Sequence, residues 1–171
     1  MPNVDLTRVP SFYHKYIEKV NADELKEAFI IHQKELFNTL NNLPESKWDY
    51  RYAEGKWSVR EMVQHMIDAE RIFCFRALCF ARKDPNALPG FDENSYVTST
   101  AGQLRPATDL IEEMKTVQKA SALLFASFTP EMLEQSGVAN NNPIYVKAIG
   151  FIVVGHALHH VGVLKERYLG R

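Results

Sequence analysis

The segment Gly155-His156-Ala157-Leu158-His159-His160 holds three of the six histidines of the chain, inside an apolar run from Ile144 to Leu164. Helical residues four apart lie on the same face, so His156 and His160 can direct their imidazoles at one point. Such a pair supplies two ligands for a divalent metal, and a third must come from another element. His65, which also has apolar neighbours, is the leading candidate.

Three neutral imidazoles would leave a bound metal with its full positive charge and at least one open position. That pattern is typical of catalytic sites, since structural sites are closed by four protein ligands. A metal of this kind lowers the pKa of a bound water or thiol, so hydroxide or thiolate becomes available at neutral pH. The ligand type does not select the metal, because imidazole suits zinc, nickel, copper and iron alike.

Other polar residues near these histidines have weaker cases. Asp68 lies one helical turn beyond His65 and could orient its imidazole or serve as an acid or base, although an interhelical salt bridge is the alternative. His159 is turned by about 100° from its neighbour, so we expect it to pack between helices or to hydrogen-bond near the site. His32 is expected to be a core residue.

The composition is that of one domain spanning residues 1–171, since 46% of residues are hydrophobic and 24% are charged. A net charge of -1 predicts no basic face for nucleic acid. The first 30 residues lack the apolar core of a signal peptide, and the run from Ile149 to Val154 is too short to span a bilayer. We therefore expect a cytoplasmic protein with no membrane partner.

Four segments show helical spacing, and no strand is evident. The clearest start is Ser58-Val59-Arg60-Glu61, which has the pattern of a capping box. The pair Asn142-Pro143, a cap residue before a proline, predicts the start of the last helix. The predicted helices span Asn21 to Leu40, Ser58 to Ala81, Thr108 to Phe128, and Asn142 to Leu169.

Helices of this number and length predict an all-α four-helix bundle. The link from Arg82 to Arg105 is long enough to cross the bundle from end to end, which would leave the second and third helices parallel. We expect the segment Leu88-Pro89-Gly90-Phe91-Asp92, or Tyr96, to lie near one end of the bundle.

Several motifs in order resemble the DinB/YfiT-like superfamily over nearly the whole chain. The resemblance implies a left-handed four-helix bundle with up-down-down-up topology, with residues 1–20 as an N-terminal extension packed on it. The motifs are Lys56-Trp57-Ser58-Val59-Arg60-Glu61, His65, Asp68-Ala69-Glu70-Arg71, Phe75-Arg76-Ala77-Leu78, Ala81-Arg82-Lys83-Asp84, Gly155-His156-Ala157-Leu158-His159-His160 and Glu166-Arg167-Tyr168-Leu169.

The resemblance also implies a divalent metal, often nickel or zinc, held by one histidine of the second helix and an H-x-x-x-H pair of the fourth. These positions are His65, His156 and His160. Well-characterised relatives include bacillithiol S-transferases and mycothiol-dependent isomerases, in which the metal binds a low-molecular-weight thiol. Fold and metal do not fix the reaction.

Two classes of function remain. The first is a metal-dependent enzyme, either a thiol-dependent transferase or a hydrolase, acting on a small molecule. The second is a non-catalytic metal-binding stress-response or structural protein. The open coordination position favours the enzyme.

Three glycines interrupt the predicted last helix. Gly150, Gly155 and Gly162 each cost about 1 kcal/mol relative to alanine. Such a cost indicates close helix contact. The same glycines would let a second subunit approach, and we expect a homodimer.

Overall fold

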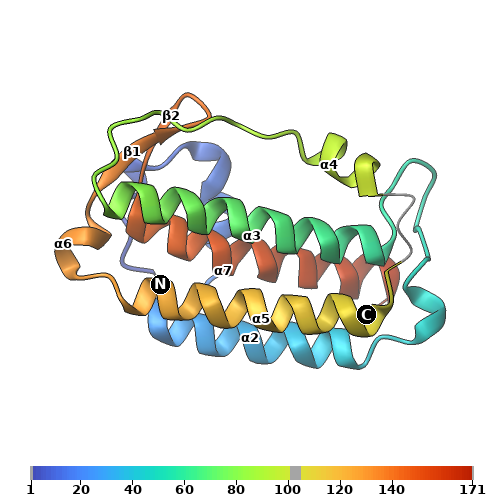
Figure 1. Ribbon diagram of the computed structural model, residues 1–171. Helices are drawn as coiled ribbons and strands as arrows, with labels where there is room; N and C mark the ends of the chain where they lie inside the picture. The colour runs from blue at the N-terminus through green and yellow to red at the C-terminus, as the bar shows by residue number, and fades with distance from the viewer. Residues whose placement is uncertain (1, 101–104, 171) are drawn as a thin grey trace.

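The computed structural model describes residues 2–100 and 105–170, and its core is a four-helix bundle (Figure 1). α2 and α7 run in one direction while α3 and α5 run in the other, which confirms the up-down-down-up order (Figure 1). α7 contacts α2 and α3, and α5 packs against the same two helices. The bundle helices are α2 (Leu25–Asn41), α3 (Val59–Ala81), α5 (Ala107–Ala126) and α7 (Val146–Val163).

The start of α3 is fixed by the predicted capping box. The Ser58 side chain accepts from the Glu61 N–H at 3.3 Å, and the Glu61 carboxylate accepts from the Ser58 N–H at 2.7 Å. These bonds satisfy two donors that the first helical turn leaves free. The position of His65, less than two turns further on, is therefore set by local sequence.

α7 is apolar around its whole circumference because other elements enclose it. The stretch Val146–Tyr168 is long and apolar enough to cross a membrane, but 72% of its most apolar window is buried inside the fold. It contacts α2, α3 and a short N-terminal helix, α1 (His14–Ile17). Burial on all sides accounts for its composition. After Val163 the helix continues as one π-helical turn, η4 (Leu164–Tyr168).

The chain before α7 corrects the sequence prediction. Asn142–Tyr145 is a strand, β2, which pairs antiparallel with β1 (Ser136–Ala139), so the expected helix start at Asn142-Pro143 was wrong. Asn140 and Asn141 have φ of 49° and 61°. Two residues with positive φ make the tight turn that joins twisted strands, and asparagine tolerates this conformation.

The first bundle helix also starts later than predicted. α2 begins at Leu25, after Glu24, and has no side-chain cap. Asn21, the predicted first residue of this helix, lies four residues before this start. The short helix α6 (Pro130–Leu133) follows α5, and η3 (Glu45–Lys47) follows α2.

The long connection between α3 and α5 crosses the bundle as predicted (Figure 1). Near its start, Leu88 hydrogen-bonds to the hairpin: its N–H donates to Val138 O at 2.9 Å and its carbonyl accepts from Asn140 N at 3.0 Å. Leu88 thus lies at one end of the bundle, where we expected it. The connection then forms α4 (Glu93–Thr100) beside α3, and residues 101–104 lie outside the described part.

The N-terminal segment packs on the bundle through η1 (Leu6–Arg8), η2 (Ser11–Tyr13) and α1. Tyr16 and Ile17 of α1 are buried against α7. The Asp5 N–H donates to the Tyr145 hydroxyl at 2.8 Å, and Arg8 pairs with Glu134 at 2.6 Å. This segment therefore covers the side of α7 that holds two of the candidate ligands.

The three glycines of α7 differ in their surroundings. A Cβ on Gly155 would collide with the backbone carbonyl of Tyr16, and one on Gly150 would press on Leu25 and Phe125. A Cβ on Gly162 would meet nothing within 4 Å. Close packing therefore explains Gly150 and Gly155, whereas the same interpretation was wrong for Gly162.

A buried polar cluster lies between α2, α3 and α5, apart from the histidine cluster. The amide of Gln118 donates to Glu70, yet Glu70 Oε1, Gln118 Oε1 and His32 Nε2 have no hydrogen-bond partner among the described residues. Burial raises the pKa of Glu70 from 4.5 to about 7. Between pH 4.5 and about pH 7, Glu70 is therefore more protonated in the folded state than in the unfolded state. The contribution of Glu70 to the free energy of unfolding falls as the pH rises through this range.

Replacing Glu70 by glutamine is expected to stabilise the fold by about 2 to 3 kcal/mol at pH 8 and by much less at pH 5. The amide keeps an acceptor for Gln118 but carries no charge to bury. Urea unfolding of both proteins at the two pH values measures the difference. Glu113→Gln is the control, because Glu113 pairs with Arg71, its pKa is lowered, and its loss should cost stability at pH 8. An equal effect of Glu70→Gln at both pH values would contradict this account.

Candidate metal centre

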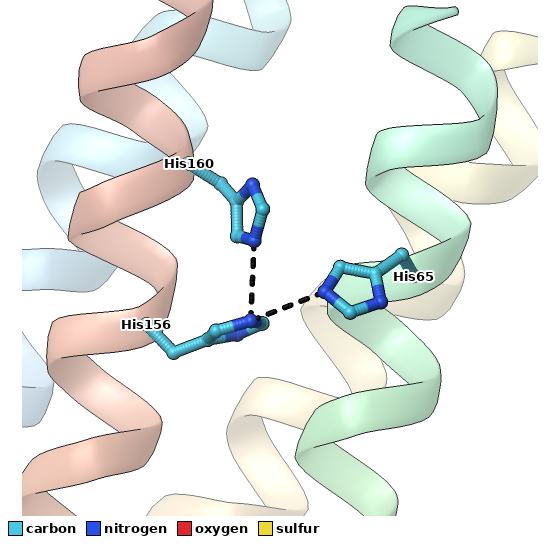
Figure 2. A group of neighbouring side chains, drawn as sticks. All are labelled: His65, His156 and His160. Carbon is cyan, nitrogen blue, oxygen red and sulfur yellow. Dashed lines mark hydrogen bonds between the residues drawn. The ribbon is translucent and has the colours of Figure 1, made fainter. Parts of the chain in front are cut away.

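His65 of α3 and the pair His156 and His160 of α7 point at one another across the helix interface (Figure 2). The Nε2 atom of His156 lies 3.2 Å from Nε2 of His65 and 3.1 Å from Nε2 of His160. One nitrogen from each ring falls within 4.8 Å of the other two. The predicted convergence of these three side chains is therefore confirmed.

All three histidines are buried, with exposed fractions of 7 to 9%. Desolvation lowers the pKa of His65 to about 4, and it lowers the pKa values of His156 and His160 well below 6.5, with neighbouring histidines adding to the effect. At neutral pH the rings are uncharged, and each has one nitrogen lone pair to offer. Neutral imidazoles are the form that binds metals.

The donor set fits a divalent metal with an open position. Three imidazole nitrogens already face a common centre, and no fourth histidine, cysteine or acidic side chain joins them within the described ranges. Nδ1 of His160 is buried and has no hydrogen-bond partner in the described part of the chain. The described protein groups therefore do not satisfy every ring nitrogen of the three histidines.

The cluster forms one wall of a cavity of about 570 Å³. The Trp57 ring lies 4.8 Å from the His65 ring, between centroids, and the Tyr16 ring lies 5.4 Å from that of His156. The cavity is large enough for a small organic molecule. Trp57 belongs to one of the motifs in the sequence, but Tyr16 was not predicted to lie near the site. Tyr16 comes from the N-terminal segment, and only tertiary packing brings it here.

Asp68 does not line this cavity. Its Oδ1 accepts from Gln64 Nε2 at 2.9 Å, and its charge interacts with Arg71, Arg105 and Glu113 on the side of α5. This placement does not support the predicted role in orienting His65 or in proton transfer. Among the described residues that line the cavity, the one carboxylate is that of Glu93, at the start of α4.

Two other histidines, His159 and His32, lie where the sequence suggested. His159 lines the cavity, with its ring 5.4 Å from that of Tyr16, but it does not belong to the cluster of three. His32 is buried in α2, and its Nδ1–H donates to the Ala28 carbonyl at 3.2 Å.

The arginines singled out by the motifs have different surroundings. Arg71 pairs with Glu113 at 2.5 Å, and Arg167 pairs with Glu166 at 3.2 Å. Arg76 differs, because it is buried and lines the same cavity as the histidines.

This chain is a four-helix bundle of up-down-down-up order, with three histidines on two adjacent helices that could bind a metal. It therefore belongs to the class of helical-bundle proteins with a candidate metal site. The sequence profile of the DinB superfamily matches residues 28–164, and the chain belongs to that superfamily. The fold is that of YfiT from Bacillus subtilis, with a TM-score of 0.72, 16% identity and coverage of 99% of this chain and 94% of that one.

Two further relatives are similar. YjoA, a DinB-like protein from Bacillus subtilis, matches with a TM-score of 0.60, 19% identity and coverage of 86% of this chain and 92% of its own. A protein of Oceanobacillus iheyensis, named "Putative metal-dependent hydrolase OB0413", is 26% identical over 153 residues, which are 86% of this chain and 87% of the relative.

Proposed function

We propose that this protein is a metal-dependent hydrolase in which His65, His156 and His160 hold a divalent metal, zinc or nickel, at the wall of the cavity. The observation that carries the proposal is the approach of three neutral Nε2 atoms to one point beside a cavity of about 570 Å³. The name of the relative from Oceanobacillus iheyensis supports it. YfiT is likewise described as a probable metal-dependent hydrolase.

The bound metal would act as a Lewis acid and lower the pKa of a water molecule towards neutrality. The residues of the chain supply the rest. The rings of Trp57 and Tyr16 lie against those of His65 and His156 and would limit the access of bulk water to the metal. Glu93 is our candidate acceptor for the proton of the attacking water, because it is the carboxylate among the lining residues of the described chain and its charge acts on His65.

Glu93→Gln is expected to lower metal-dependent hydrolysis of an activated ester such as 4-nitrophenyl acetate by about 100-fold, the usual contribution of a general base. The assay uses untagged protein loaded with one equivalent of zinc or nickel. Asp68→Asn is the matched control and should retain full activity, since Asp68 faces Gln64 and not the cavity. A greater loss in Asp68→Asn than in Glu93→Gln would overturn the assignment of Glu93.

A parallel assay separates the other candidate functions. Conjugation of a low-molecular-weight thiol to 1-chloro-2,4-dinitrobenzene, without ester hydrolysis, would identify a thiol-dependent transferase that uses the same open position. Tight metal binding with neither reaction would favour the non-catalytic alternative. Hydrolysis that persists after the metal is removed by a chelator would contradict the proposed function.

A further inference from the structure

Arg76 of α3 is a buried cation that has no acidic partner in the described part of the chain. The residue is 4% exposed, and its Nη2 atom donates to the Pro89 carbonyl at 2.9 Å. Its guanidinium also lies close enough to the Tyr13 phenol to influence its pKa, and it lies 5.9 Å from the centre of the Phe73 ring. Within residues 2–100 and 105–170, no carboxylate forms an ion pair with it.

Two other arginines of α3 show what Arg76 lacks. Arg60 pairs with Asp49 at 2.8 Å, and Arg71 pairs with Glu113 at 2.5 Å. An arginine stays charged in proteins, and a buried charge is costly unless it is paired. Tyr13 does not supply a negative charge, because burial raises the pKa of its phenol. Glu93 is a carboxylate in the lining of the same cavity, but it forms no ion pair with Arg76. Among the described residues, the charge of Arg76 therefore has no ion-pair partner.

Arg76 and the histidine cluster line the same cavity. Arg76 follows His65 by eleven residues, close to three helical turns, so both lie on one face of α3, about 16 Å apart along its axis. Long side chains on a helix lean towards its N-terminus, which here is the direction of His65. The Phe73 ring lies between the two groups, with its centroid 6.1 Å from that of His156.

Several aromatic side chains line the cavity that the two groups share. Besides Phe73, they include Phe12, Tyr16, Trp57 and Phe91. Such walls fit a flat apolar body, and a guanidinium presents paired donors that match the oxygens of a carboxylate or phosphate.

We propose that Arg76 anchors the oxyanion group of the substrate, a carboxylate or phosphate, while an aromatic or other apolar body extends along the Phe73 wall towards the three histidines. The substrate class of the proposed hydrolase is then small organic acids or phosphate monoesters with an apolar body. The statement about the substrate class rests on the proposed function, because it assumes that the protein is a hydrolase. The binding of an anion at Arg76 does not depend on it, because that binding needs no metal.

The test compares three ligands of one shape on metal-free, full-length protein: 2-naphthoate, 2-naphthyl phosphate and the neutral 2-naphthamide. The wild type should bind at least one of the anions about tenfold or more tightly than the amide, the gain expected from a charge-assisted hydrogen bond. The anion that binds more tightly identifies the group. Arg76→Gln should bring the anion-to-amide ratio close to one, and Arg76→Lys should leave an intermediate ratio.

Arg82→Gln is the matched control, because Arg82 lies on the surface at the end of α3, beside Phe128, and does not line the cavity. It should keep the wild-type ratio. His156→Ala should keep the ratio as well while losing metal, so failure of the metal site and failure of the anion site are distinguishable. Circular dichroism checks that each variant is folded.

Two results would overturn the proposal. The first is a wild type that binds the amide as tightly as both anions, a result that depends on no variant. The second is a folded Arg76→Gln or Arg76→Lys protein that keeps the full preference for the anion.

Discussion

His160→Ala is expected to abolish stoichiometric metal binding while the bundle stays folded. The substitution removes one of three nitrogen ligands and leaves only His65 and His156. Loss of an outer partner of a metal ligand already costs about 10- to 100-fold in affinity, so loss of a ligand should exceed about 100-fold. Metal analysis after gel filtration, together with thermal melts with and without chelator, measures both effects.

The fold should survive because two large clusters of buried apolar side chains hold the bundle together. Leu36 and Met66 in one cluster and Ile152 in the other, for example, are each at most 1% exposed. His159→Ala is the control: it removes a histidine beside His160 that does not belong to the cluster, and it should retain the metal. If chelation and His160→Ala both unfold the protein, the ion is structural and the enzyme proposal fails.

Gly155→Ala is expected to lower the free energy of unfolding by about 1 to 3 kcal/mol, the usual cost of overpacking. The added Cβ would meet the backbone carbonyl of Tyr16, which cannot rotate away as the end of a side chain can. α1 must then move off α7, and the Tyr16 ring must leave His156. Urea unfolding measures the loss of stability, and an increased rate of amide exchange in α1 locates it.

Gly162→Ala, on the same helix, is expected to have the opposite effect on stability. Its added Cβ meets nothing within 4 Å, so the change should stabilise the fold by about 0.5 to 1 kcal/mol through helix propensity. Equal effects of the two substitutions would show that α1 does not pack on α7 as described.

The bundle could be predicted from sequence because its signals are local. The capping box at Ser58 and Glu61 and the apolar spacing within each helix are properties of adjacent residues. The hairpin before α7 was missed because Asn142-Pro143 is also a plausible start of a helix. The better signal was Asn140-Asn141, since two adjacent asparagines can form a tight turn with positive φ.

The site was predictable where spacing alone places its residues. His156 and His160 share a face because they are four apart, and the motif order supplied His65. The same geometry explains why Asp68 does not line the cavity. Three residues along a helix turn the Asp68 side chain about 60° away from the direction of His65. Arg76 follows His65 by eleven residues and so lies on the same face of the helix as His65. This spacing could have predicted from the sequence that Arg76 lies near the site. Tyr16 and Glu93 come from outside the bundle helices, and no periodicity predicts them.

The most direct test of the central claim is the X-ray absorption spectrum of the protein loaded with one equivalent of zinc. We expect three imidazole nitrogens at about 2.0 to 2.1 Å and one further light ligand from solvent, as in catalytic zinc sites. The His160→Ala protein should not yield this spectrum at the same metal concentration. Sulfur ligation, which would implicate Cys74 or Cys79, or fewer than three imidazoles in the wild type, would contradict a metal centre at His65, His156 and His160.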